Sequence, residues 1–237
     1  MAISTNPLAW LRSVQPRRAI ALLLLLLPLT VGAQTVRDLW LSMPPSLAPY
    51  LSTSLRTQCL DFYDMHTDAK TDNALKGKSR IDTLTSTFLA ATLSKAHTLQ
   101  MKLLPASGSG LGSALGSGSG SSSSLSSCDS VLCVVRSWDG PKRDSEVQLF
   151  DRQWKPLQAP LTFSADSFVC RPDTMSEERF SRLVALFDPI MFSVSLSPAE
   201  NVLLVKLSPV VPNPEDEKAI EQILVQRKLK WDGKTFK

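Results

Sequence analysis

Histidine is scarce in this chain of 237 residues, which has only His66 and His97. The residues around His97 predict a turn at 95–97, so we expect its side chain to be exposed rather than placed as a general base. The sequence also lacks the Gly-x-Ser-x-Gly nucleophile elbow, the Gly-x-Gly-x-x-Gly fingerprint and the Walker-type phosphate loop. These absences argue against the common motif-bearing hydrolases and nucleotide-binding proteins. We predict a protein that is not an enzyme and that uses no cofactor.

A strong charge of one sign is also missing, because 26 basic residues face 22 acidic ones. Three of the bases, Arg12, Arg17 and Arg18, lie in the first 33 residues, where no acidic residue occurs. Without that segment, 23 bases would face 22 acids, for a net charge of +1. A chain this close to neutrality gives no reason to expect nucleic acid or an anionic membrane as its partner.

The N-terminal segment has the order of a cleaved secretory signal. Its basic residues lead into an apolar run at 19–30, which is too short to span a hydrocarbon core of roughly 30 Å comfortably. Val31, Gly32 and Ala33 then supply small or compact residues at a cleavage site. We predict that 1–33 is a signal peptide and that the mature chain begins near Gln34. The protein would then be exported to the periplasm or cell surface of a Gram-negative bacterium. An uncleaved N-terminal anchor is the alternative, and no later apolar run approaches the length of a membrane span.

Cysteine is sparse as well, with four residues: Cys59, Cys128, Cys133 and Cys170. Export would permit disulfides. However, Cys59 and Cys133 sit among apolar neighbours, where buried free thiols are common. The spacing of Cys128 and Cys133 is not that of a usual zinc knuckle. Paired and free states both remain open.

Residues 106–127 consist almost entirely of glycine, serine, alanine and leucine. Such a segment cannot bury enough apolar surface to offset the entropy lost on ordering. Strand-like runs flank it on both sides, and long insertions at loop tips cost little closure entropy. We predict a flexible loop that connects two strands.

The remaining sequence alternates between helical and strand-like periodicity. It predicts helices at 36–43, 46–62, 172–188 and 216–224, where the last could instead be a strand entry, and Pro44 and Pro45 end the first helix. It predicts strands at 80–85, 87–94, 97–104, 130–136, 146–150, 154–158, 190–196, 201–207 and 225–231, with 234–236 closing a last hairpin. We therefore predict an α+β fold in which helices pack on one face of a mostly antiparallel sheet. We expect the other face to be open to solvent or to a partner.

Two parts of the chain share a pattern. Phe88, Lys102 and Pro105 recur as Phe192, Lys206 and Pro209, and Trp-Asp-Gly occurs at both 138–140 and 231–233. The pattern indicates two related helix-plus-β-meander halves, although unrelated hairpins also share such residues. The predicted organisation is a signal peptide (1–33), a first half (34–105), a flexible loop (106–127), a continuation of the first-half sheet (128–171) and a second half (172–237).

Polar residues that could bind a metal crowd the end of the second predicted helix: Asp61, Asp64, His66 and Asp68. Carboxylates suit hard cations, and imidazole suits transition metals. A solvated turn is the commoner explanation of such a cluster, so we predict no metal. Acidic residues at 177–178 and 215–217 stand at predicted helix N-termini, where negative charge stabilises a helix without any catalytic role.

Three tryptophans adjoin predicted turns and are candidates for a binding face: Trp138, Trp154 and Trp231. Together they could line a groove for a sugar or a peptide. Alternatively, each could pack over its own hairpin as a small core. Exposed aromatic side chains in a row would favour carbohydrate binding, whereas buried ones would favour contact with a protein.

The runs RDLWLSMPPSLAPYL (37–51), GKSRIDTLTSTFLAATLSKAHTLQMKLLP (77–105) and SEVQLFDRQWKPL (145–157) resemble an uncharacterised exported family, a domain of unknown function found in gut and oral anaerobic Gram-negative bacteria. The resemblance would cover most of the mature chain. It implies no activity that could be assigned to individual residues. The loop at 106–127 would be a departure from the short turn expected in such relatives.

Export, a stable sheet and an accessible face together favour a soluble binding or envelope-structural protein. We expect it to contact an unknown protein partner in the cell envelope through a sheet face or edge. A small-ligand or carbohydrate-binding module is the alternative, and a hydrolase comes third.

The cleavage site gives a first test. We expect the protein purified from cells that naturally produce it to begin near Gln34, because signal peptidase requires small residues just before the cut. N-terminal sequencing and intact mass would show this. Ala33→Arg should leave the longer chain uncleaved, whereas the same change at Ala2, far from the cut, should not. A full-length chain in wild-type cells would contradict the prediction.

Overall fold

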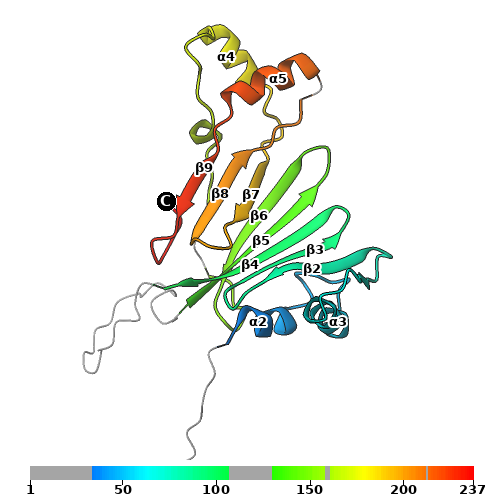
Figure 1. Ribbon diagram of the computed structural model, residues 1–237. Helices are drawn as coiled ribbons and strands as arrows, with labels where there is room; N and C mark the ends of the chain where they lie inside the picture. Colours follow the sequence, from blue (N-terminus) through cyan, green and yellow to red (C-terminus); the bar gives the residue numbers. More distant parts are fainter. Residues whose placement is uncertain (1–33, 107–129, 158–160, 212) are drawn as a thin grey trace, which may run out of the picture. The chain divides into compact units, whose positions relative to one another are not determined.

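The computed structural model describes residues 34–106, 130–157, 161–211 and 213–237, and these contain four α-helices and two antiparallel sheets (Figure 1). The first part consists of α2 (Val36–Ser42), α3 (Thr53–Asp64) and the strands β1 (Thr71–Asp72), β2 (Lys78–Leu84), β3 (Phe88–Ser94), β4 (His97–Pro105), β5 (Ser130–Asp139) and β6 (Arg143–Phe150). The second part consists of the 3₁₀ helix η3 (Ala165–Phe168), α4 (Glu177–Val184), β7 (Phe192–Leu196), β8 (Val202–Leu207), α5 (Pro214–Ile223) and β9 (Arg227–Lys230). The predicted α+β class is confirmed. The predicted signal peptide and residues 107–127 of the predicted loop lie outside the described residues.

The first two helices begin where side chains satisfy their free backbone groups. At α2, the Thr35 N–H donates to the Asp38 carboxylate (2.7 Å), and the Asp38 N–H donates to Thr35 Oγ1 (3.4 Å), which forms a capping box. Ser52 caps α3. The predicted start of this helix at residue 46 is wrong, because residues 45–50 form turns and the Ser52 cap starts the helix at Thr53.

The six-stranded sheet is a meander in which each strand pairs antiparallel with the next one in the chain. β4 and β5 pair along their whole length, from His97 opposite Trp138 to Pro105 opposite Ser130. The tight connections at 73–77, 95–96 and 140–142 all lie at the same end of this sheet. We call it the hairpin end, and it brings together turns that are far apart in the sequence.

The central strands are covered on both faces. All residues of β5 from Ser130 to Val135 are buried. One face packs against α2 and α3 in a core around Trp40 and Leu99, and the opposite face packs against the second sheet in a core around Cys133 and Val205, to which α4 and α5 also contribute side chains. The expectation of an open sheet face is therefore wrong for the central strands, because the second sheet occupies that side. Only the part near β2 leaves side chains exposed there, such as Lys78 and Arg80.

The edge of β7 is held against the first sheet by side chains. The Val194 N–H donates to Ser145 Oγ (3.0 Å), and the Leu196 N–H donates to Gln100 Oε1 (2.7 Å). These bonds satisfy donors that an edge strand would otherwise leave free. They also fix β7 across β4 and β6 without a continuous backbone ladder.

A buried lysine joins the two sheets from inside. Lys102 of β4 is only 2% exposed, and its Nζ donates to the carbonyl oxygens of Ser197 (2.6 Å), Pro198 (2.9 Å) and Glu200 (2.8 Å). Three acceptors match the three donors of an ammonium group. They belong to the turn between β7 and β8, where the Glu200 carbonyl oxygen also accepts the Val202 N–H (2.9 Å). Burial lowers the pKa of Lys102, and the charge of Glu200 opposes this effect.

The predicted strand at 154–158 is wrong. The Asp151 carboxylate accepts the N–H groups of Gln153 and Lys155 (both 2.9 Å), which bends the chain into a tight turn. Trp154 takes a left-handed conformation with φ 64°. Only an isolated bridge between Phe150 and Pro156 remains, since proline cannot donate to a ladder.

The proposed halves correspond in part. Trp138 pairs with His97, and the Trp231 N–H donates to the carbonyl oxygen of Asn201, the position that the alignment matches with His97. However, the first sheet has six strands, whereas the second has three and places α5 between its last two. A duplication therefore stays a prediction.

The thiols of the described cysteines are free. Cys59 and Cys133 are buried and Cys170 is exposed, while Cys128 lies outside the described residues. Burial raises the pKa of both the Cys133 and the Cys59 thiol. In the described part of the chain, no helix is long and apolar enough to cross a bilayer.

Replacing the buried lysine should destabilise the fold. Lys102→Met keeps the length of the side chain but leaves three turn carbonyls without their donor, and we expect a loss of about 3 kcal/mol in the free energy of unfolding. Urea denaturation would measure it. Lys206→Met is the control, because Lys206 is exposed on β8 and matches Lys102 in the sequence alignment. Equal stability of the two variants would contradict a stabilising role for the bonds from Lys102 to the three turn carbonyls.

Candidate functional site

The candidate metal ligands are not brought together. The Asp64 carboxylate forms an ion pair with Arg37 of α2, and His66 lies exposed beyond α3 with φ 52°. Within the described ranges, no group of three or more His, Cys, Asp or Glu side chains could hold a metal ion. The structure thus assembles no metal site from Asp61, Asp64, His66 and Asp68.

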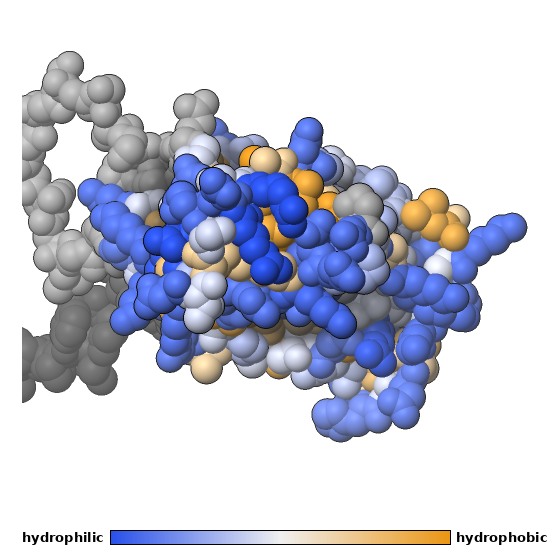
Figure 2. All heavy atoms as spheres, turned by 90° about the horizontal axis from the view of Figure 1, so that it is seen from above, coloured by the Kyte–Doolittle hydropathy of each residue, from blue (hydrophilic) through white to orange (hydrophobic). Residues whose placement is uncertain are grey.

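The other acidic groups stand where the sequence predicts them. Glu177 and Glu178 lie in the first turn of α4, and residues 215–217 lie in the first turn of α5. There their negative charges interact favourably with the positive N-terminal ends of the helix dipoles. Figure 2 looks onto the end of the molecule that carries α4 and α5 and shows a mostly hydrophilic surface with a smaller hydrophobic area among it. These acids therefore have a structural explanation that needs no chemistry.

The three candidate tryptophans do not form a row. Trp154 is buried on the helix side, where its Nε1 donates to Ser42 Oγ (3.2 Å). Trp231 packs on Phe236 on the other side of the sheet and donates to the Pro105 carbonyl oxygen (2.6 Å). Trp138, at the hairpin end, is 39% exposed. Of the three, it alone presents a large accessible surface.

Trp138 is stacked on a buried histidine. Its ring lies 5.1 Å from the His97 ring, with 10° between the two planes, because the two residues are directly opposite in the β4–β5 pairing. Tyr50, which precedes α3, bonds to His97 Nδ1 through its hydroxyl and packs edge-on against the same ring. The predicted exposure of His97 is wrong, since β4 begins at this residue and Trp138 and Tyr50 cover it, which leaves it 7% exposed.

A charged pair completes the group. The Arg136 guanidinium lies 5.4 Å from the centre of the Trp138 ring and forms an ion pair of 2.6 Å with Glu146, its partner on β6. We call Tyr50, His97, Arg136, Trp138 and Glu146 the Trp138 cluster. It fixes one face of the indole on imidazole and places a cation near the ring.

The titration of the cluster follows from its burial. Burial lowers the pKa of His97, and the positive charge of Arg136 lowers it further. Burial also raises the pKa of Tyr50 to about 12. At neutral pH the imidazole is therefore uncharged and the phenol is protonated. In the described part of the chain, His97 Nε2 is buried without a hydrogen-bond partner.

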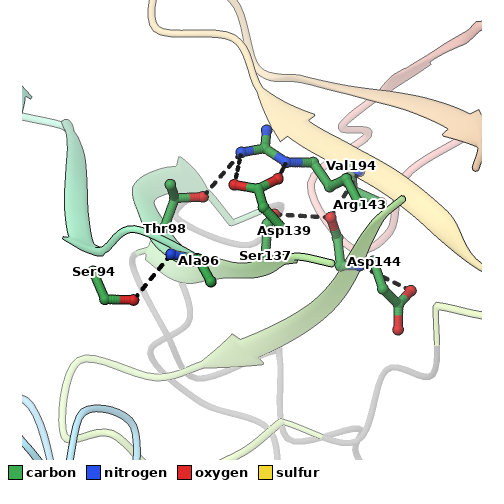
Figure 3. Close-up of polar contacts among 9 residues, drawn as sticks. Ser94, Ala96, Thr98, Ser137, Asp139, Arg143, Asp144 and Val194 are labelled. Carbon is green, nitrogen blue, oxygen red and sulfur yellow. Dashed lines mark hydrogen bonds and ion pairs between the residues drawn. The ribbon is translucent and has the colours of Figure 1, made fainter. Parts of the chain in front are cut away.

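Bonds on the opposite side of β5 hold the same hairpin rigid (Figure 3). Arg143 Nε donates to Asp139 Oδ1 (2.7 Å), and this bond is the largest cause of a lowered Asp139 pKa. Ser137 and Ser145 share a hydrogen bond of 2.8 Å, and Ser145 accepts the bond from the β7 backbone described above. The residues on either side of Trp138 are thus fixed.

A second exposed apolar side chain, Leu75, lies at the hairpin end. The Ala74 N–H donates to the Tyr50 carbonyl oxygen (3.1 Å), and the adjacent Leu75 is 67% exposed. Four large apolar side chains are exposed in the described residues, and two of them, Leu75 and Trp138, are at the hairpin end. The sequence named only Trp138. Pairing the predicted strands 97–104 and 130–136 with each other could have placed His97 and Arg136 near Trp138. Nothing in the sequence around Tyr50 indicates that it would join them.

Comparisons with known proteins give a family and a fold. A family model described as "Protein of unknown function (DUF3256)" matches residues 28–111 and 123–236, and the gap between the two matched stretches, 112–122, falls within the predicted glycine- and serine-rich loop. No curated protein matches the chain. The chain is similar to a solved structure, a domain of an uncharacterized protein from Porphyromonas gingivalis W83, with a TM-score of 0.61 and 21% identity over 85% of this chain and 98% of that one. At this identity, the likeness shows the fold alone.

The buried histidine should make stability depend on pH. His97 has a folded pKa below its ordinary value of 6.5, so as the pH falls below 6.5 the unfolded chain takes up a proton that the folded chain resists. We expect a loss of up to about 1 kcal/mol between pH 6.5 and 5.5, measured by urea denaturation.

His97→Gln should reduce this loss, because glutamine does not titrate. His66→Gln is the matched control, since it removes the other, exposed histidine. A wild-type pH dependence in the His97 variant would show that His97 is not its source.

Proposed function

Because the chain belongs to the family of proteins of unknown function DUF3256, which carries no assigned activity, we propose from the geometry that it is a non-catalytic binding protein. It contacts a protein partner through the hairpin end of its six-stranded sheet. The sequence resemblance to a family of unknown function is confirmed to this extent. Export to the cell envelope is part of the proposal.

The observation that carries the proposal is an exposed tryptophan held in one orientation. Tryptophan is enriched among the residues that dominate protein interfaces, and a side chain already fixed loses little entropy when it binds. Trp138 is 39% exposed, yet its ring is stacked on His97 and lies beside Arg136. It can enter a pocket on a partner without first being ordered.

The surroundings favour a protein over a sugar as the partner. Leu75 is a second exposed apolar side chain at the same end of the sheet, and charged side chains there, such as Lys95 and Arg143, supply a polar rim. An apolar centre with such a rim is the usual anatomy of a protein interface. Carbohydrate modules instead use several aromatic rings in a row, and Trp154 and Trp231 lie elsewhere. The contact therefore uses the end of the sheet rather than its covered central face.

Site-specific photocrosslinking tests the proposal. A photoreactive phenylalanine would replace Leu75 or Trp138 in cells that naturally produce the protein, and we expect a discrete crosslinked partner from both positions. Met65 and Ile190 are matched control positions, because they are exposed apolar side chains outside the hairpin end. With the identified partner, Trp138→Ala should weaken binding about 30-fold, as for a central interface residue.

Two results would overturn the proposal. Crosslinks that form equally at the control positions, or at none, would remove the hairpin end as a docking surface. Protection of Trp138 from acrylamide quenching by simple sugars would instead favour the carbohydrate-binding alternative.

A further inference from the structure

A basic cavity lies beside the hairpin end, on the side of the sheet that faces away from α2 and α3. Its volume is about 640 Å³, within the range of small-ligand sites. Its lining residues come from the approach to β1, the β1–β2 connection, β2, β3 and the β3–β4 turn: Lys70, Leu75, Lys76, Gly77, Lys78, Arg80, Thr92, Ser94, Lys95 and Ala96. Five of them are cationic and none is acidic.

Only part of this charge is neutralised. Lys78 pairs with Asp72 and Arg80 pairs with Asp82, both at 2.6 Å. Lys70, Lys76 and Lys95 form no ion pair with any acidic side chain that the structure describes. Three like charges around one cavity repel each other, and a bound anion would relieve that repulsion.

The turn that carries Lys76 is held by hydrogen bonds to a buried asparagine. Asn73, which is buried, accepts the N–H groups of Leu75 and Gly77 at its Oδ1 (both 3.0 Å) and donates from Nδ2 to the Leu93 carbonyl oxygen (2.8 Å). This ties the turn to β3. Gly77 has no side chain to crowd Asn73, since an added Cβ would lie 3.1 Å from Asn73 Nδ2. The lysine is thus presented by a fixed backbone.

The cavity also offers a free hydroxyl donor. Ser94 Oγ accepts a bond from the Ala96 N–H (3.2 Å), as Figure 3 shows, which leaves the hydroxyl hydrogen available to a ligand. By contrast, the Thr92 hydroxyl donates to Asp82 (2.7 Å) and is already engaged. Ammonium groups together with a hydroxyl donor are suited to an oxyanion.

We propose that this cavity binds a multiply charged oxyanion of the phosphate type, carried by a small molecule or by a lipid headgroup. A phosphate monoester or pyrophosphate brings close to two or more negative charges and several acceptor oxygens, which is enough to pair with three ammonium groups. A single carboxylate, with one negative charge, could not neutralise all three. The inference does not need Trp138 or the helix side of the sheet, but Leu75 and Lys95 belong both to the cavity lining and to the hairpin-end surface proposed above.

Calorimetric titration of the purified protein with pyrophosphate, at constant ionic strength, tests the inference. We expect saturable binding that sulfate competes for weakly and chloride does not. Lys70→Gln combined with Lys95→Gln should weaken it about tenfold or more, as expected for the loss of two charge-assisted contacts. Lys155→Gln combined with Lys234→Gln is the control, since it removes the same charge from exposed sites outside the cavity.

Sedimentation with vesicles that contain phosphatidic acid, against vesicles of phosphatidylcholine alone, distinguishes the two sources. Binding to pyrophosphate, to the phosphatidic-acid vesicles or to both supports the inference if the Lys70/Lys95 variant loses that binding. The Lys155/Lys234 control variant must retain it. Equal losses in the two variants would show general charge attraction and overturn the inference. An absence of binding to both probes would overturn it as well.

Discussion

The register between β4 and β5 is the constraint on which most of the molecule depends. With His97 opposite Trp138, the aromatic rings stack on the helix side, while Lys102 points to the other side and reaches the turn of the second sheet. Since strand side chains alternate between faces, a slip of one residue would exchange these two sets. The exposed indole, the neutral imidazole and the buried ammonium group are thus consequences of the same pairing.

Much of the fold could be predicted from periodicity. The strands β2 to β5, β7 and β8 agree with their expected positions within a few residues, because each has a strong apolar pattern and clear ends, and α4 lies inside its longer predicted range of 172–188. Ser176 caps α4 by accepting the Arg179 N–H at its side-chain oxygen (3.3 Å). The errors occurred where local chemistry overrides the pattern, as where Asp151 bends the chain before Pro156 and where the Ser52 cap starts α3 later than its apolar spacing indicates.

The site was less accessible to prediction because it depends on contacts between distant segments. His97 looks like a turn residue until Trp138 and Tyr50 are placed around it, and these come from 41 residues later and 47 residues earlier in the chain. Likewise, a lysine in an alternating strand gives no sign that it will be buried. Lys102 and Lys206 match in sequence, yet only the first has a cage of carbonyls within reach.

The attachment of β7 has an evolutionary consequence. A backbone ladder would impose one angle between two sheets, whereas here three side chains, Gln100, Asp144 and Ser145, receive the N–H groups of the incoming strand. Together with Lys102 and the apolar core around Cys133 and Val205, these bonds join the two sheets without a shared ladder, so substitutions among them can change the angle between the sheets without disturbing the pairing inside either one. Divergent relatives of this fold would then differ more in how their two sheets are set against each other than in the sheets themselves.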